Sequence, residues 1–293
     1  MLDVLLPFYG DPGLLRLAVR SVLDQHAEEW RLVIVDDCYP DPGVQDWCTS
    51  LDDERVTYHR NETNLGANRN YERALSYASA DYVTVMGADD LMLPNYVDLV
   101  LRAAERFDAP EVIQPGVSVV DGTGRPVAPL VDRTKGWLRP RATEPVVLRG
   151  EALAARLLLG NWTYFPSLCW HRKTIAGIGF RPGFDVVQDL AMLLDVCLAG
   201  GRLLFDPELA FLYRRHATSD SGVRTLSGHR FDEERRVFAD LGRAMQEAGW
   251  PRAARAARVH LTSRLHAGAL LPRALGRGDL ASARQLVRHG LGG

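Results

Sequence analysis

The sequence lacks several features that identify whole classes of protein. Its four cysteines form no C-x-x-C pair and show no metal-binding spacing with histidine, so we expect reduced thiols in a cytoplasmic protein: Cys38, Cys48, Cys169 and Cys197. No apolar run approaches the ~18 residues of a membrane-spanning helix, and we expect no signal peptide before the first strand-like run. The formal net charge of −2 at pH 7 gives no reason to expect nucleic acid or an acidic membrane as a partner.

Two phosphate-binding motifs are also absent. No G-x-G-x-x-G follows the first strand-like run, which argues against a classical dinucleotide-binding domain, and no G-x-x-x-x-G-K-[ST] is present. What remains is an ordinary globular composition, with 46% hydrophobic and 25% charged residues. A chain of 293 residues is long enough for one large domain or two small ones.

The first third of the chain alternates between short apolar strands and amphipathic helices. Four strand-like runs, rich in β-branched and apolar residues, are separated by segments with helical spacing: Leu2–Pro7, Arg31–Val35, Val56–Tyr58 and Val83–Met86. Strands and helices that alternate in this way form a parallel sheet with right-handed crossovers. We therefore predict an α/β fold with a mostly parallel central sheet flanked by helices.

Polar and aromatic residues follow three of these strands where each one ends. They are Pro7-Phe8-Tyr9, Asp36-Asp37 and Asp89-Asp90. Ligands of open parallel sheets bind beyond the carboxyl ends of the strands, where paired acids can hold a hard divalent cation and a diphosphate. Aspartates at strand ends also cap turns and helices without any ligand, so each pair has a structural alternative.

The rest of the chain changes character. Residues 111–120 predict one or two strands, 125–149 a long loop with four prolines, and 203–205 and 209–213 two late strands. After residue 222 the pattern is helical and rich in arginine, with predicted helices at about 230–248, 251–270 and 279–289. We divide the chain into residues 1–222, with a nucleotide-binding half (1–110) and an acceptor half (111–222), and a C-terminal helical extension (223–293).

The order of these motifs resembles the inverting family-two glycosyltransferases of the GT-A fold. The resemblance covers about residues 1–222 and rests on six motifs, which are the aromatic strand end after Pro7, Asp36-Asp37, Asn64-Leu65-Gly66 with Arg69 and Asn70, Asp89-Asp90, Gln188-Asp189 at a helix start, and Tyr213-Arg-Arg-His216. It implies a GT-A fold and transfer of a sugar from a nucleotide diphosphate with inversion at the anomeric carbon.

The resemblance also assigns roles to individual residues. Pro7, Phe8 and Tyr9 would line the base pocket, and Asp36 would accept a hydrogen bond from the ring N–H of uracil or thymine. Asn64, Gly66 and Arg69 would lie near the base and diphosphate, and Asp89 near the ribose. Asp90, with His216, would hold Mg²⁺ or Mn²⁺, and Asp189 would be the general base. A role for Asp37 stays open.

The acceptor side is less well marked. Trp162, Tyr164 and Phe165 are either core aromatics or a wall for the acceptor, and Gln188 stands beside the predicted base. Two positions depart from the family pattern. Gly87 replaces a frequent aspartate of the acidic run, and Gln188 replaces a glutamate that often precedes the base. The Arg-rich C-terminal helices are either a solvated face, an acceptor or membrane surface, or a homodimer interface.

The predicted function is an inverting glycosyltransferase that uses a UDP- or dTDP-linked sugar and a small-molecule, glycan or lipid-linked acceptor hydroxyl. We expect no nucleic-acid partner and a cytoplasmic location, with contact to a membrane surface left open. A sugar-nucleotide pyrophosphorylase would need a glycine-rich G-x-G-T-R-like loop, which Pro7-Phe-Tyr-Gly-Asp11 is not. A degenerate GT-A-like binding or scaffold domain is the non-enzymatic alternative.

Overall fold

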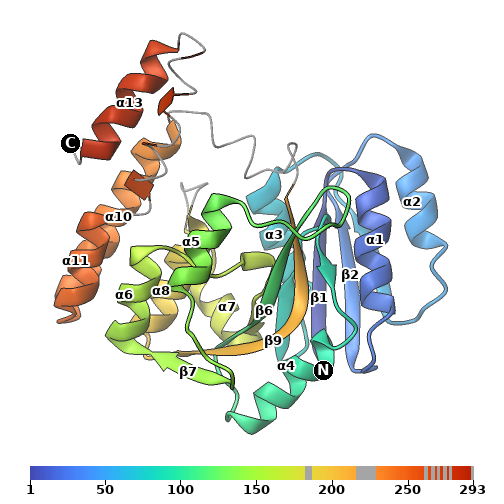
Figure 1. Ribbon diagram of the computed structural model, residues 1–293. Helices are drawn as coiled ribbons and strands as arrows, with labels where there is room; N and C mark the ends of the chain where they lie inside the picture. Colours follow the sequence, from blue (N-terminus) through green and yellow to red (C-terminus); the bar gives the residue numbers. More distant parts are fainter. Residues whose placement is uncertain are drawn as a thin grey trace.

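The fold is known from a computed structural model, shown in Figure 1. It describes residues 1–181, 187–215 and 229–260, and in the last part of the chain residues 263–264, 268, 271–272, 276 and 279–291. His216 and the segment 182–186 before the predicted base lie outside the described residues. All statements below concern the described part of the chain.

The first half of the sheet is parallel, as predicted. Strands β1 (Leu2–Phe8), β2 (Trp30–Asp36), β3 (Val56–Arg60) and β4 (Tyr82–Val85) lie in the order β3-β2-β1-β4, and every pairing among them is parallel. Helices α1 (Pro12–Leu23), α2 (Pro42–Thr49) and α3 (Ala67–Leu75) connect them. All seven residues of β1 are buried, because helices cover both faces of a parallel sheet.

The second half makes the sheet mixed and not mostly parallel. Antiparallel β8 (Cys169–His171) joins β4 to β6 (Val112–Asp121), and β6 pairs in parallel with β9 (Arg202–Arg215). Two short strands, β5 (Leu91–Met92) and β7 (Val146–Arg149), pair antiparallel with β9. The two late strands predicted at 203–205 and 209–213 are therefore one strand of fourteen residues.

The predicted long loop at 125–149 contains regular structure. Helix α5 (Leu130–Leu138) and strand β7 both lie in it. The prediction was wrong because the prolines stand at the element boundaries and do not interrupt the elements. Pro129 is the N-cap residue that directly precedes α5, and Pro140 follows its C-cap residue Arg139.

The helices form one layer on each face of the sheet. Helices α1, α2 and α4 (Tyr96–Arg106) pack in one core cluster on one face. The other cluster holds α3, α6 (Gly150–Leu159), α7 (Arg172–Ile178) and α8 (Gln188–Leu198) together with two C-terminal helices, α10 (His229–Glu247) and α11 (Pro251–Val259). The last helix is α13 (Leu280–Leu291).

Helices α10 and α11 of the C-terminal extension share a core cluster with residues 1–215. Phe238, Leu241 and Met245 of α10 are buried in that second cluster, as the apolar spacing predicts. Three further apolar residues of this C-terminal extension, Leu261, Leu265 and Leu270, lie outside the described residues. No helix in the described part combines the length and the apolar character that crossing a membrane requires.

Candidate functional site at the carboxyl ends of the strands

The ends of β1 and β2 lie side by side, because parallel strands in register finish at one edge of the sheet. Phe8 is paired with Asp36, and the backbone N–H of Asp37 donates to the carbonyl of Phe8 at 2.9 Å. Strand β4, on the other side of β1, leads into Asp89 and Asp90. The three strand ends singled out in the sequence are thus neighbours.

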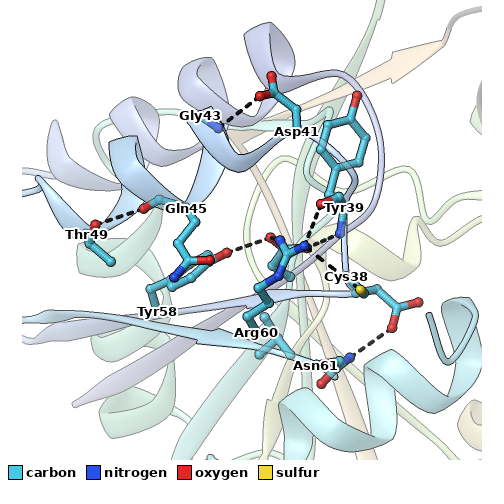
Figure 2. A network of polar contacts seen from close by, with 12 residues as sticks. Cys38, Tyr39, Asp41, Gly43, Gln45, Thr49, Tyr58, Arg60 and Asn61 are labelled. Atoms are coloured by element: carbon cyan, nitrogen blue, oxygen red, sulfur yellow. Dashed lines mark hydrogen bonds and ion pairs between the residues drawn. The ribbon is translucent and has the colours of Figure 1, made fainter. Parts of the chain in front are cut away.

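Asp36 is buried and serves the structure. Its Oδ1 accepts the backbone N–H of Tyr39 at 2.7 Å, and its Oδ2 accepts the Tyr58 hydroxyl at 2.6 Å and the Arg60 guanidinium at 2.7 Å. Figure 2 shows this network, in which Arg60 also donates to the carbonyl of Tyr39. Burial and the nearby Asp36 raise the pKa of the Tyr58 hydroxyl. The Asp36 carboxylate is therefore not exposed to accept the predicted hydrogen bond from a nucleotide base.

Asp37, whose role the sequence left open, shapes the loop of the Asn64-Leu65-Gly66 motif. Its carboxylate accepts the backbone N–H groups of Leu65, at 2.8 Å, and Gly66, at 2.9 Å, and the amide of Asn61, at 2.9 Å. Gly66 has a φ of +81°, a conformation that side chains rarely adopt. The loop is consequently held against the end of β2, with Asn64 and Arg69 exposed at the edge of the sheet.

The aromatic surface at this edge differs from the predicted one. Pro7 and Phe8 are buried in β1, so neither side chain can line a base pocket, whereas Tyr9 is exposed. The ring of Tyr39 lies 5.1 Å from that of Phe8 and 5.6 Å from that of Tyr9. The aromatic groups at this edge are Tyr9 and the half-buried Tyr39. The sequence analysis did not identify Tyr39.

The two acids after β4 have different surroundings. Asp90 is only 1% exposed, and its Oδ1 accepts the backbone N–H of Arg214 at 2.7 Å. Burial, followed by the neighbouring charge of Asp89, raises the pKa of Asp90 well above its usual range. Asp89 is partly exposed, and its carbonyl accepts the Arg214 guanidinium at 2.7 Å. Asp90 is thus turned inward, Asp89 is the more exposed of the two acids, and the predicted metal ligation by Asp90 stays a prediction.

Gly87 stands where related sequences often have another acid, and the structure shows why the position is small. A Cβ built on Gly87 would lie 2.6 Å from Oδ2 of Asp90 and 2.9 Å from Oδ1 of Asp89. The close approach of these two carboxylates leaves no room for a side chain. The glycine at position 87 thus accompanies the inward orientation of the Asp90 side chain.

The donor set fits a cation that is shared with a diphosphate. No group of three histidine, cysteine, aspartate or glutamate side chains gathers anywhere in the described residues, so the protein alone offers no closed cage. Mg²⁺ typically takes one or two carboxylates and completes its shell with water and substrate phosphates, and Mn²⁺ prefers similar oxygen ligands. Asp89 suits this pattern.

Asp189 lies in the first turn of α8 and is partly exposed. Its Oδ2 accepts the side-chain amide of Asn161 at 2.7 Å, and Oδ1 of Asn161 accepts the hydroxyl of Thr163 at 2.7 Å. Gln188 is buried and exchanges two hydrogen bonds with the backbone of Arg181, at 3.0 and 2.7 Å, so it holds the chain before α8 and does not face an acceptor.

Helix α5 lies next to Asp189 and is tied down by charged side chains. Asp132 forms an ion pair with Arg215 at 2.6 Å and accepts the Tyr164 hydroxyl at 3.0 Å. Lys135 donates to the carbonyl of Thr163 at 2.6 Å. Burial lowers the pKa of Lys135 to about 8, and the negative charge of Asp189 opposes that fall. The apolar patterns of the sequence carry no sign of these polar contacts.

Trp162 and Tyr164, two of the aromatic residues considered for an acceptor wall, have different surroundings. Trp162 is 1% exposed and packs edge-on against Phe205, with ring centroids 5.6 Å apart, so it is a core residue and its assignment to the acceptor was wrong. Tyr164 is half-buried, and its ring lies 5.1 Å from that of Tyr213 and 4.2 Å from the Lys135 ammonium. Tyr164 is therefore the aromatic residue next to α5.

Comparison with known proteins agrees with this geometry. The family described as "Glycosyl transferase family 2" matches residues 3–148, which include three of the strand ends described above. The chain belongs to glycosyltransferase family 2. The transferase is 31% identical over 242 residues to the uncharacterized protein MT1568 of Mycobacterium tuberculosis, which covers 78% of this chain and 72% of that protein.

Two further comparisons place the transferase more broadly. It is 32% identical over 108 residues to the colanic acid biosynthesis protein WcaA of Escherichia coli, but this match covers 36% of the chain and only 39% of WcaA. The crystal structure of S. aureus TarS 1-349 in complex with UDP-GlcNAc superimposes with a TM-score of 0.66 over 97% of this chain and 90% of that one. At 15% identity this likeness shows the GT-A fold alone.

Proposed function

We propose that this family 2 glycosyltransferase is an inverting enzyme in which Asp189 is the general base. The observation that supports it is the state of Asp189, which is partly exposed at a helix start and has one oxygen held by Asn161 at 2.7 Å. A base must be oriented and still accessible to the proton that it takes. Asp189 takes the proton of the acceptor hydroxyl while that oxygen attacks the anomeric carbon from the side opposite the diphosphate.

The donor is a nucleoside diphosphate sugar, with a uracil or thymine base as the proposed preference. Support comes from the fold neighbour TarS, which was solved with UDP-GlcNAc and with UDP. In this chain Tyr9 and Tyr39 offer aromatic surface at the edge where the base would lie, and Arg69 is exposed in α3, which follows the loop that Asp37 holds. Aromatic faces of this kind stack against bases.

A divalent cation, Mg²⁺ or Mn²⁺, belongs to the proposal, with Asp89 as the ligand from the described residues. When bound, such an ion stabilises the negative charge of a departing diphosphate. Asp90 is not a ligand in this scheme. It holds the backbone of Arg214, whose guanidinium in turn fixes the carbonyl of Asp89 and so the place of the ligand.

The acceptor is a hydroxyl compound that reaches Asp189 beside Tyr164 and α5. A small molecule, a glycan and a lipid-linked sugar all satisfy this requirement. A cytoplasmic site of action is supported by the four cysteines, all of which are free thiols, as is usual in reducing compartments. Fractionation of cells that express the chain checks the location, and recovery outside the cytoplasm would contradict it.

Replacement of Asp189 by asparagine tests the mechanism, because the change keeps the shape and removes the basicity. We expect Asp189→Asn to lower turnover by about 10²–10⁴-fold while UDP affinity stays nearly unchanged. Asp98→Asn, on the outer surface of α4, is the matched control and should transfer normally. NMR of the product should show the anomeric configuration opposite to that of the donor.

Two results would contradict the mechanism. They are a product with retained configuration and an Asp189→Asn enzyme with near-native turnover. Calorimetry with UDP, dTDP, CDP and GDP tests the donor separately. We expect UDP or dTDP to bind at least about tenfold better than CDP, and a preference for GDP would reject the proposed base pocket. Nucleotide binding without transfer or donor hydrolysis in the presence of Mn²⁺ would favour the scaffold alternative.

A further inference from the structure

Helix α5 turns two charged side chains toward the protein and two apolar side chains toward the solvent. Asp132 and Lys135 point inward, where Asp132 pairs with Arg215 and Lys135 donates to Thr163. Its apolar side chains Leu130 and Trp137, spaced seven residues apart on one face, are 64% and 65% exposed. A surface helix of a globular protein ordinarily buries its apolar face and presents its charges to water. An apolar partner outside the protein would explain the inversion.

Exposed apolar residues gather at this point of the molecule. Among the described residues, twelve large hydrophobic side chains are exposed, and four of them lie between positions 127 and 137. These four, which we name the α5 outer face, are Val127, Leu130, Val131 and Trp137. All six tryptophans of the chain are described, and only Trp137 is exposed. Clustered apolar groups mark a contact surface, whereas single ones do not.

The exposed charges along the chain segment of the α5 outer face are all positive. Between residues 125 and 141 the exposed charged side chains are those of Arg125, Arg133, Arg139 and Arg141. The one acid in that stretch, Asp132, is 9% exposed and already paired with Arg215. The whole chain carries a formal charge of −2, so this basic segment is a local feature. Tryptophan and leucine flanked by arginine are the groups that enter the headgroup region of an anionic bilayer.

We propose that the α5 outer face binds the surface of an anionic lipid bilayer and holds Asp189 close to it. Leu130 and Trp137 enter the headgroup boundary, and Arg133 and Arg141 contact lipid phosphates. The inner side of the helix is linked to Asp189 by a chain of hydrogen bonds. Lys135 donates to Thr163, the Thr163 hydroxyl donates to Asn161, and the Asn161 amide donates to Asp189. Figure 1 shows α5 away from helices α1 and α2.

Vesicle binding tests this proposal without any need for transfer activity. The full chain is sedimented with vesicles of phosphatidylcholine alone and with vesicles that also contain phosphatidylglycerol. We expect binding only to the anionic vesicles, weakened by salt and accompanied by a blue shift of tryptophan emission. Leu130→Gln/Trp137→Gln should lower the partition at least tenfold. Arg133→Gln/Arg141→Gln should lower it about thirtyfold at low salt.

Matched controls lie elsewhere on the surface. Arg252→Gln/Arg255→Gln makes the same charge change on α11, and Leu17→Gln removes an exposed leucine from α1. Both should bind anionic vesicles as the wild type does, and all variants should keep UDP affinity, which shows that they are folded. The proposal is overturned if the wild type does not bind anionic vesicles at low salt, or if only the α11 variant loses binding. Light scattering that shows a dimer broken by Leu130→Gln/Trp137→Gln would assign the face to a second copy instead.

Discussion

Two Asp-Asp pairs end neighbouring regions of the same sheet, and the structure uses them differently. In the pair after β2, both carboxylates are buried, and each accepts hydrogen bonds from three donors of the surrounding chain. In the pair after β4, Asp90 is buried against Arg214 while Asp89 is partly exposed. The same dipeptide thus builds a loop in one place and presents a candidate ligand in the other. The number of backbone and guanidinium donors nearby decides which role a carboxylate takes.

The largest effect on activity is expected when the two acids after β4 are replaced by asparagine, one at a time. Asp89→Asn should remove the Mn²⁺-dependent part of UDP affinity and lower turnover by about 10²-fold or more, because cationic stabilisation of a leaving phosphate contributes several kcal/mol. Asp90→Asn keeps an oxygen for the backbone N–H of Arg214 and should retain Mn²⁺ dependence. Calorimetry with and without EDTA measures both. The reverse outcome, dependence lost only in Asp90→Asn, would restore Asp90 as the ligand.

An intermediate effect is expected in the pair after β2. Asp37→Ala leaves the N–H of Leu65 without its acceptor, removes an acceptor of the Asn61 amide and leaves the N–H of Gly66 with only Oδ1 of Asn64, so we expect about 2–4 kcal/mol loss of unfolding free energy and weaker UDP binding. Asp41→Ala, which removes the side-chain cap of α2, should cost only about 1 kcal/mol and leave UDP affinity unchanged. Urea denaturation with a constant m-value measures the difference. Equal losses in both variants would show that Asp37 does no more than a helix cap.

The smallest effect concerns the lysine of α5 and its pH dependence. In the folded chain the pKa of Lys135 is about 8, below its ordinary value of 10.5. Below pH 8 both states hold the proton and the cost of the half-buried charge is present in full. Between about pH 8 and 10.5 the unfolded state binds more protons, so folding stability should rise with pH.

The comparison variant is Lys135→Met, which cannot titrate. Relative to it, the wild type should gain about 1–2 kcal/mol across that window, a figure reduced because the side chain is only half-buried. Urea midpoints measured from pH 7 to pH 10 give the difference directly. A gain on lowering the pH would mean that Lys135 is stabilised as an ion, and its pKa would then be raised.

Part of the site was predictable because its pattern is local. The strand ends at Asp36-Asp37 and Asp89-Asp90 follow apolar runs that any sheet would bury, and their meeting at one edge follows from parallel pairing. The start of α8 at Gln188 was also predicted, from the resemblance to the family. The network of α5 could not be predicted, because polar contacts such as Lys135 with Thr163 have no periodicity.

The sequence by itself determined the alternation of strands and helices, the family and the set of acids that meet at the sheet edge. These depend on apolar periodicity and on residue types at element ends, both of which are read over a few neighbouring residues. Only the tertiary structure decided that Asp89 faces outward while Asp36, Asp37 and Asp90 do not. The donor that turns Asp90 inward is the backbone of Arg214, 124 positions away, and burial by residues so distant depends on packing that no local pattern encodes.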